Sequence, residues 1–484
     1  MSNRSFKDFG LSEETLKALF KLRYENPTEV QAKVIPEVLK GRDIIVKSQT
    51  GSGKTAAYAI PICENLILAQ KNPQVLVLTP TRELTVQVKE DFSHVGRFNR
   101  IRCAAIFGKQ PIDVQKRELK QRVHVIVGTP GRTFDHIERG NIILDDIRYL
   151  VLDEADKMLD MGFIDQVESI VSLLPSDRIT MLFSATLPEK IEEICNKYMI
   201  KPLKIELQAD NPTVEKIEQW YYEVEDSKKF NVLKGIIYTE KPESCIVFCN
   251  TREKVEEVLM EMKREQYYCA ALHGGMEQSN RLNTIQGFKR GEFHFLIATD
   301  VAARGLHIED VSHVINYEVP MERESYIHRT GRTGRAGKEG VAITLSTKRE
   351  LRFLHEIEEY IQLSIPQKDI PTEQEVALGM EEYEESIKSK PKAKADVAER
   401  LNREITKIRI NSGKRSKMRA GDILGAITSI EGVTGDDIGI IDIQNTCTYV
   451  EVFGKVGDLV ARKLPTLTIK GKLLTVKKIR MRTM

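Results

Sequence analysis

The chain has 484 residues, of which 41% are hydrophobic and 30% charged, and its formal net charge is +2. This length suggests about three domains, each with its own core. The seven cysteines are scattered without paired spacing or a nearby histidine, which argues against a disulfide framework or a zinc site. The start, MSNRSFKDFG, has no apolar segment, and no apolar run reaches about 18 residues. We therefore expect no signal peptide, no membrane span and a reducing, cytoplasmic location.

Between about residues 40 and 205, short apolar stretches alternate with helical patterns. The stretches include DIIVKS, QVLVLTP, VHVIVGTP, YLVLDEAD and TMLFSAT. This alternation predicts a parallel sheet with helices on both faces.

A glycine-rich turn, SQTGSGKT, follows the first of these strands and precedes a helical pattern. The strict phosphate-loop pattern has Gly where Ser48 stands, but Gly51 and Gly53 still allow backbone N–H groups to surround a phosphate. Lys54 supplies charge to the β- and γ-phosphates, and Thr55 can ligate Mg²⁺. The sequence therefore predicts a nucleotide site in this turn.

The stretch LVLDEADKML, residues 150–159, ends an apolar run with three carboxylates. In isolation it is typical of a solvated turn before a helix. With a phosphate loop in the same domain, Asp153 is expected to hold Mg²⁺ and Glu154 to orient the attacking water. The alternative role for Glu154 is a favourable negative charge at a helix N-terminus.

The alternating pattern restarts after a polar stretch near residues 208–212, with SCIVFCN, CAALHGG, FLIATD, HVINYEVP and VAITLS. We predict a first domain over 1–208 and a second over 218–366, the second without a phosphate loop of its own. Residues 367–403 are rich in Pro, Glu and Lys and predict a linker with helical stretches. Residues 404–484 follow the order strand, helix, strand, strand, helix, strand, which predicts a small α/β sandwich.

Seven motifs occur here in the order and approximate spacing of the DEAD-box ATP-dependent RNA helicases. They are SQTGSGKT, PTREL, TPGR, DEAD, SAT, ATDVAARG and HRTGRTGR, so residues 1–365 resemble that family. The resemblance implies two RecA-like domains that close together on ATP, Mg²⁺ and single-stranded RNA.

The resemblance also implies roles for single residues. Phe6 corresponds to an aromatic that stacks on adenine, and Gln31 to an amide that reads the adenine edge. The implied nucleotide-binding residues are Phe6, Gln31, Ser48, Gln49, Thr50, Gly51, Ser52, Gly53, Lys54 and Thr55. Thr55 and Asp153 would hold the metal, and the implied catalytic residues are Lys54, Asp153, Glu154, Arg332 and Arg335.

Arg329, Arg332 and Arg335 recur every three residues, which alone is typical of a solvated basic face. The resemblance implies instead that Arg332 and Arg335 reach the γ-phosphate. It further implies that Asp156, Ser184, Thr186 and His328 couple ATP hydrolysis to domain closure.

The implied RNA contacts would fall on phosphates and sugars and so be independent of sequence. They are Arg82, Gly108, Thr129, Arg132, Thr251, Gln278, Arg281 and Thr299. The chain departs from the family pattern at four positions. Arg23 and Lys109 stand where Gly is usual, Thr85 where Ala is usual, and His307 where an Asp contacts the ATP ribose. The last exchange predicts weaker or pH-sensitive closure on ATP.

The C-terminal region resembles the RNA-recognition-motif-like domain of the bacterial DbpA subfamily of these helicases. Its two central strands carry a single aromatic, Tyr449, so base stacking on the sheet is not expected. A basic loop is the expected RNA contact, with a solvated charge run as the alternative, and contains Lys414, Arg415, Lys417 and Arg419. The resemblance implies anchoring on a hairpin of 23S ribosomal RNA and a role in 50S subunit assembly.

The leading hypothesis is a monomeric RNA-stimulated ATPase that separates short RNA duplexes in 50S assembly intermediates. Three alternatives remain at this point. They are a general cold-shock or mRNA-decay helicase, an RNA clamp that uses ATP without significant unwinding, and a DNA helicase.

Overall fold

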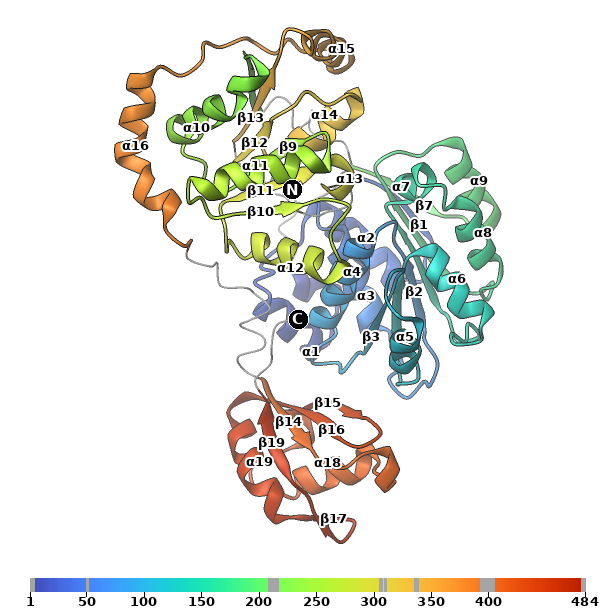
Figure 1. Ribbon diagram of the computed structural model, residues 1–484. Coiled ribbons are helices and arrows are strands. Elements are labelled where there is room, and N and C mark those ends of the chain that lie inside the picture. Colours follow the sequence, from blue (N-terminus) through green and yellow to red (C-terminus); the bar gives the residue numbers. More distant parts are fainter. Residues whose placement is uncertain are drawn as a thin grey trace. The chain divides into compact units, whose positions relative to one another are not determined.

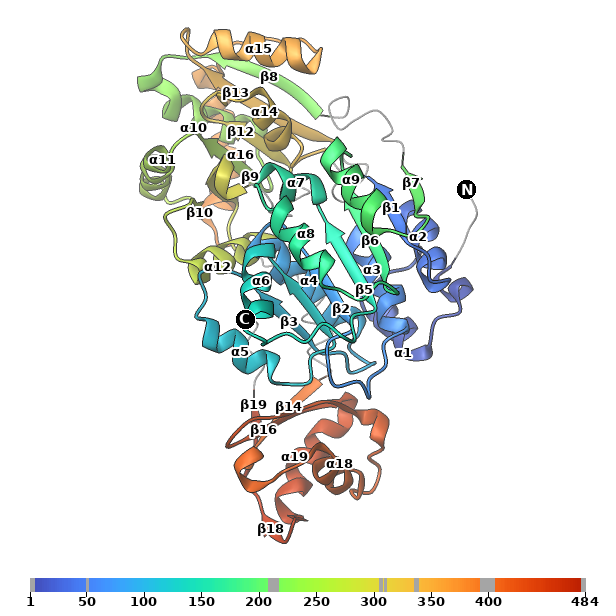
Figure 2. The same ribbon diagram turned by 90° about the vertical axis from the view of Figure 1, so that its right-hand side faces the viewer.

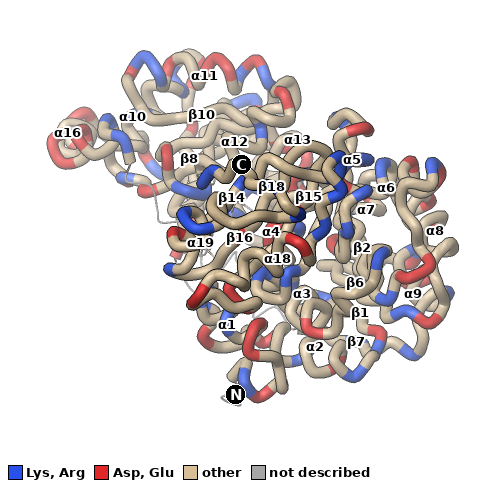
Figure 3. The backbone as a smooth tube through the Cα atoms, turned by 90° about the horizontal axis from the view of Figure 1, so that it is seen from below, with Lys and Arg blue, Asp and Glu red and all other residues tan. Residues whose placement is uncertain are grey.

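The computed structural model describes residues 5–48, 52–207, 217–303, 308, 311–334, 339–391 and 405–479 (Figure 1). Within these ranges there are sheets of seven, six and four strands and one two-stranded hairpin. Basic and acidic residues, 73 and 71 in the sequence, are interspersed along the chain (Figure 3). Among the described residues, no helix is both long and apolar enough to cross a membrane.

The first sheet is entirely parallel and has the strand order β3-β4-β2-β5-β6-β1-β7. Its strands are β1 Ile44–Lys47, β2 Val75–Leu78, β3 Cys103–Ile106, β4 Val125–Gly128, β5 Tyr149–Asp153, β6 Ile179–Ser184 and β7 Leu203–Glu206. The central strands are buried on both faces, which explains their short, continuous apolar runs.

Two hydrophobic clusters cover the two faces of this sheet. One face packs against η1 Phe6–Phe9, α1 Glu13–Lys21, α2 Glu29–Leu39, α3 Lys54–Glu64 and α4 Arg82–Val95. The other packs against α5 Ile112–Leu119, α6 Pro130–Glu138, α7 Ala155–Asp160, α8 Ile164–Ser172 and α9 Glu189–Tyr198 (Figure 2). The loops that carry the sequence motifs leave the carboxyl ends of the strands, where open α/β sheets bind their ligands.

The second sheet is also entirely parallel, in the order β10-β11-β9-β12-β13-β8. Its strands are β8 Ile217–Glu223, β9 Cys245–Cys249, β10 Cys269–Leu272, β11 Phe295–Thr299, β12 His313–Asn316 and β13 Gly340–Ser346. Its helical elements are η2 Asp226–Lys228, α10 Lys229–Glu240, α11 Arg252–Arg264, α12 Gln278–Lys289, α13 Asp300–Ala303, α14 Arg323–Thr330 and α15 Leu351–Ile361.

The beginning of the predicted linker packs onto this second domain. Gln367 forms a β-bridge with Tyr221, and helix α16, Glu373–Lys388, lies along α10 with Ile387 fully buried. The Lys368 ammonium lies 3.4 Å from the centre of the Trp220 ring, a cation–π contact. The prediction that 367–403 is a linker is therefore wrong for residues 367–388, which belong to the second compact unit. The many charged residues of this segment made the narrow apolar stripe on one face of α16 hard to recognise in the sequence.

The C-terminal sheet is antiparallel in the order β15-β16-β14-β19, with helices α18 Ala420–Thr428 and α19 Gly457–Lys463 on the core. The strands are β14 Ile405–Ile410, β15 Ile438–Ile443, β16 Thr448–Phe453 and β19 Val476–Ile479. A small hairpin, β17 Thr468–Ile469 and β18 Lys472–Leu473, precedes the last strand and was not predicted. The predicted fold class, two parallel-sheet α/β domains and a small α/β sandwich, is confirmed.

Candidate functional site

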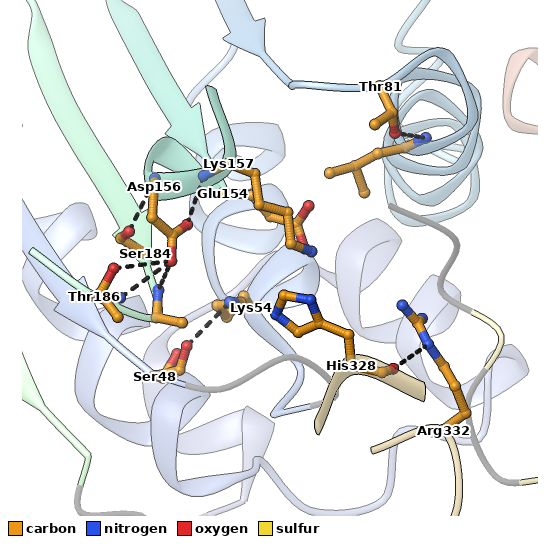
Figure 4. Close-up of polar contacts among 12 residues, drawn as sticks. Ser48, Lys54, Thr81, Glu154, Asp156, Lys157, Ser184, Thr186, His328 and Arg332 are labelled. Carbon is orange, nitrogen blue, oxygen red and sulfur yellow. Dashed lines mark hydrogen bonds and ion pairs between the residues drawn. The ribbon is translucent and has the colours of Figure 1, made fainter. Parts of the chain in front are cut away.

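The phosphate-loop helix α3 begins directly after a glycine in the left-handed region. Gly53 has φ +89°, and a Cβ at this position would lie 2.6 Å from Gln31 Nε2. Any side chain there would therefore be both strained and obstructed. Lys54 is buried and its Nζ donates to the Ser48 carbonyl at 3.1 Å, as Figure 4 shows. Gln49, Thr50 and Gly51 lie outside the described residues.

Residues at the start of α2 form hydrogen bonds to this loop. Thr28 Oγ1 donates to the Ser52 carbonyl at 2.9 Å, and Gln31 Nε2 donates to the Gly53 carbonyl at 3.2 Å. Gln31 Oε1 accepts from the Thr28 N–H at 3.0 Å, which completes the N-terminal cap of the helix. Gln31, which the resemblance assigns to the adenine edge, therefore also connects helix α2 to the phosphate loop.

The structure alters the expectation for adenine stacking. Phe6 is only 3% exposed and belongs to the core cluster, with the Tyr24 ring stacked on it at 6.3 Å between centroids. Tyr24 is 37% exposed, so it is the ring that a ligand can reach. Arg23, the residue before it, has φ +60°, which explains why glycine is the usual residue there. Phe6 thus packs against Tyr24, the more exposed ring of the pair.

Asp153 ends strand β5 and is almost completely buried. Its Oδ2 accepts a hydrogen bond of 2.8 Å from the hydroxyl of Tyr58, one turn after Thr55 in helix α3. Burial, and then the negative charge of Asp153, raise the pKa of Tyr58 well above its usual value, so the phenol stays protonated and donates. Asp153 and Thr55 fit Mg²⁺, which takes one or two protein oxygen ligands together with phosphates and water. Sequence reasoning missed Tyr58.

Glu154 has φ +53° and is 2% exposed. This left-handed conformation is uncommon for a residue with a side chain, and such strain concentrates at functional sites. The Lys157 ammonium, one turn along α7, lies 2.7 Å from Glu154 Oε1 (Figure 4). The carboxylate is therefore held in place by a cation that the sequence did not single out.

Asp156 connects the DEAD motif to the SAT motif (Figure 4). Its Oδ2 accepts from the backbone N–H groups of Ala185 and Thr186, each at 3.1 Å, and from Thr186 Oγ1 at 3.4 Å. In return the Asp156 N–H donates to Ser184 Oγ at 3.1 Å. Oδ2 of Asp156 is thus bound by the SAT turn, so the two motifs are joined by direct hydrogen bonds.

Arg329 and Arg332 of HRTGRTGR do not share one solvated face. Arg329 is 1% exposed and forms an ion pair with Asp300, with Nε 2.6 Å from Oδ1. Its other N–H groups donate to Asn250 Oδ1, Asn316 Oδ1 and the carbonyl of Glu318, so it holds several loops of the second domain together. Arg332 is partly exposed and its Nε donates to the His328 carbonyl at 3.2 Å, as drawn in Figure 4. Arg335 and His307 lie outside the described residues.

The expected RNA residues of the first domain all follow carboxyl ends of parallel strands. Arg82 begins α4 after β2, Gly108 follows β3, and Thr129 precedes α6 after β4. A Cβ at Gly108 would lie 3.6 Å from the Arg82 guanidinium, so these two motifs adjoin. Arg132 donates from Nη1 to the carbonyl of Gln110 at 2.8 Å. The structure brings these residues together along one edge.

Two departures from the family pattern in this region have structural explanations. Lys109 has φ +61°, the conformation that glycine adopts most easily. Thr85, where Ala is usual, is buried with its hydroxyl 2.7 Å from that of Thr79 and 2.8 Å from the Thr81 carbonyl. The hydroxyl that distinguishes Thr85 from Ala therefore has hydrogen-bond partners.

The second domain repeats this arrangement. Thr251 caps α11 after β9 by accepting from the Lys254 N–H at 3.1 Å, Gln278 begins α12 after β10, and Thr299 ends β11. Arg281 Nη2 donates to the Ala302 carbonyl at 2.7 Å. Each residue again lies at the carboxyl edge of its sheet.

In the C-terminal domain the basic loop is exposed and held by backbone hydrogen bonds. The N–H groups of Lys414 and Arg415 donate to the carbonyls of Gln444 and Asn445 at 2.8 and 2.9 Å. Arg419 is the N-cap residue of α18, and its N–H donates to Asp422 Oδ2 at 2.8 Å. On the sheet, Phe453 shares the strand parity of Tyr449, so a second aromatic was missed.

Comparisons with known proteins identify the family. The family model for DEAD/DEAH box helicases matches residues 28–194, the helicase conserved C-terminal domain matches 228–337, and the DbpA RNA binding domain matches 407–478. Together these matches cover most of the chain. The protein belongs to the DEAD-box ATP-dependent RNA helicases.

Individual relatives show which type of DEAD-box helicase the chain resembles. The ATP-dependent RNA helicase DbpA of Bacillus subtilis (strain 168) is 50% identical over 473 residues, covering 98% of this chain and 99% of the relative. The DEAD-box helicase CshA of Geobacillus kaustophilus is 44% identical over 78% of this chain and 81% of its own length. The structure of S. cerevisiae Dbp5 bound to RNA and ADP BeF3 is similar with a TM-score of 0.67 and 31% identity, covering 80% of this chain and all of that one. Within the family, the chain is of the DbpA type, an ATP-dependent RNA helicase that uses ATP with Mg²⁺.

Proposed function

We propose that the protein separates short duplexes of ribosomal RNA during assembly of the 50S subunit, while its C-terminal domain anchors it on a hairpin of 23S RNA. The observation that carries the proposal is similarity over the full length. The match to B. subtilis DbpA covers 98% of the chain and so includes the C-terminal domain, whereas the match to CshA covers 78%. An anchor next to a helicase core raises the effective concentration of neighbouring duplexes at that core.

In the proposed ATP site, Lys54 and the phosphate loop bind the phosphates, and Asp153 and Thr55 hold Mg²⁺, which neutralises charge on the phosphates when bound. Glu154 orients the attacking water, and its contact with Lys157 holds the buried carboxylate in place. Tyr24, supported by Phe6, stacks on adenine. Arg332 and Arg335 supply positive charge to the transition state. The bonds of Asp156 to the SAT turn support a coupling role for this residue with Ser184, Thr186 and His328.

In the proposed RNA site, the two carboxyl edges bind phosphates and sugars. The contacts come from Arg82, Gly108, Thr129, Arg132, Thr251, Gln278, Arg281 and Thr299. Lys414, Arg415, Lys417 and Arg419 bind the anchoring hairpin. The exposed positions of these four cations on a seated loop support that role.

The test compares ATPase stimulation of the full chain by a 23S fragment that contains the hairpin and by an unrelated RNA of equal length. The proposal predicts half-maximal stimulation at a much lower concentration of the 23S fragment. Equal stimulation would exclude the ribosomal assignment and favour a general RNA helicase. ATP-dependent RNA binding without turnover on either RNA would favour a clamp.

A further inference from the structure

A buried glutamine in helix α5 connects two of the RNA motifs without belonging to either. Gln115 has no exposed surface. Its Oε1 accepts from Arg132 Nη1 at 3.1 Å and lies 3.0 Å from His136 Nε2. Its Nε2 donates to the Phe107 carbonyl at 2.8 Å and to Gln110 Oε1 at 2.7 Å. Both lone-pair sites and both N–H groups of the amide are therefore used.

These hydrogen bonds connect helix α6, which carries the TPGR motif, to the loop of residues 107–110. Arg132 contacts Gln115 and the Gln110 carbonyl, and Gln115 in turn holds both ends of the loop, at Phe107 and Gln110. Between these ends lie Gly108 and Lys109, the latter in the left-handed region at φ +61°. A left-handed residue with a side chain costs about 1–2 kcal/mol, so the loop needs fixed ends to keep this conformation.

The orientation of the Gln115 amide follows from its neighbours. His136 is fully buried in α6, and its Nδ1 lies 3.2 Å from Asn141 Nδ2, an amide nitrogen that can only donate. The proton of the imidazole is therefore on Nε2, which donates to Gln115 Oε1. Burial, followed by the charge of Arg132, lowers the pKa of His136, which favours this neutral form.

We propose that Gln115 is a positioning residue for RNA binding, because it holds Arg132 and the 107–110 loop in one contact surface. The inference rests on the proposed function, in which Arg132 and Gly108 contact RNA. Gln115 itself is buried and acts only through them.

The test uses the full chain with Gln115→Met, which keeps the side-chain volume and removes all four hydrogen bonds. We expect the RNA concentration for half-maximal ATPase stimulation to rise about tenfold, which corresponds to roughly one charge-assisted hydrogen bond. The kcat at saturating RNA and the KM for ATP should stay within about twofold. The slope of log affinity against log salt should become shallower by about 0.7 for each RNA phosphate that the variant no longer neutralises. Gln115→Glu keeps the acceptor for Arg132 and should restore part of the affinity.

A matched control separates positioning from general stability. Gln74 is also fully buried and forms two hydrogen bonds with the Ile67 backbone. It precedes β2, however, and so lies at the amino ends of the strands, opposite the carboxyl ends that carry the RNA motifs. Gln74→Met should lower the melting temperature and leave RNA affinity unchanged. Equal losses of RNA affinity in Gln74→Met and Gln115→Met would overturn the proposal.

A double-mutant cycle with Arg132→Ala gives the second criterion. Because Gln115 acts through Arg132 in part, the double variant should bind RNA more tightly than the product of the two single effects predicts. Full additivity would overturn the proposal while leaving Arg132 as an RNA-binding residue. No effect of Arg132→Ala itself would instead remove Arg132 from the proposed RNA site, and the role of Gln115 with it.

Discussion

Two residues in the sequence motifs or next to them adopt backbone conformations that side chains rarely occupy. Glu154 and Lys109 both have positive φ, at +53° and +61°. Each such residue costs about 1–2 kcal/mol and persists only where its surroundings fix it. Lys157 fixes the first, and Gln115 fixes the loop that contains the second. Strain at these positions is thus matched by specific contacts.

Replacement of Glu154 by Gln tests the assignment of the attacking water. The amide keeps the size of the side chain and an oxygen for Lys157, but it cannot accept a proton. We expect kcat for ATP to fall by at least about a hundredfold, while ATP-dependent RNA binding measured by fluorescence anisotropy is retained. If both activities were lost together, the separation of hydrolysis from binding would be wrong.

Buried histidines give the stability of the first domain a defined pH dependence. Burial lowers the pKa of His124 to about 4, and its Nδ1 accepts from the Arg102 N–H at 3.0 Å, a bond that needs the neutral ring. The unfolded chain, with a histidine pKa of about 6.5, binds the proton more readily. The contribution of neutral His124 to the free energy of unfolding is therefore complete above about pH 6.5. It is lost as the pH falls toward 4, which lowers the free energy of unfolding by roughly 2–3 kcal/mol.

His124→Asn keeps an acceptor and removes the titration, so it should flatten the decline in unfolding free energy between pH 6.5 and 4.5 measured by urea denaturation. The exposed His355 provides the control, and His355→Asn should leave the decline unchanged. An unaltered pH dependence in His124→Asn would show that other groups cause it.

Single residues were predictable where a local motif marks them. Lys54, Asp153 and Asp156 lie where the motifs indicated, each at the carboxyl edge of the first sheet. Their supports were not predictable, because Tyr58 lies in an apolar helical run and Gln115 lies between motifs. Such residues become visible only when the fold brings distant segments together.

At the scale of elements, the central parallel strands were predictable because burial on both faces produces short, continuous apolar runs. The edge strands β7 and β8, which are partly exposed, were not predicted. Helix α16 was not assigned to the second domain, because only one narrow face of it is apolar. Val376, Tyr383 and Ile387 lie on that face, spaced by seven and four residues among many charges. The hairpin β17–β18 is too short for a periodic signal.

The docking of α16 can be tested at Gly379. A Cβ there would overlap the backbone carbonyl of Tyr238 in α10. Although Gly→Ala inside a helix normally stabilises by up to about 1 kcal/mol, Gly379→Ala should destabilise the second domain, because α16 must move away from α10. Hydrogen exchange in α16 should accelerate.

Leu378→Ala is the matched control, because Leu378 precedes Gly379 on the same helix and is 63% exposed. It should leave exchange in α16 close to that of the unmodified protein. A stabilising effect of Gly379→Ala would mean that α16 does not pack as described.

At the scale of the molecule, the proposed function divides the work between the helicase sheets and the C-terminal sandwich. The contacts proposed for the helicase domains fall on phosphates and sugars, which carry no sequence information. Under that proposal, specificity for one RNA comes from the C-terminal domain, whose basic loop is held by bonds to Gln444 and Asn445.

The most direct measurement is the rate at which the full chain, with ATP, separates a short RNA duplex attached to the 23S hairpin. The comparison is the same duplex attached to a hairpin of equal length with a scrambled loop. At protein concentrations below saturation, we predict faster separation beside the 23S hairpin, and loss of that advantage when Lys414, Arg415, Lys417 and Arg419 are replaced by Ala. Equal rates on the two RNAs would contradict the proposed division between motor and anchor.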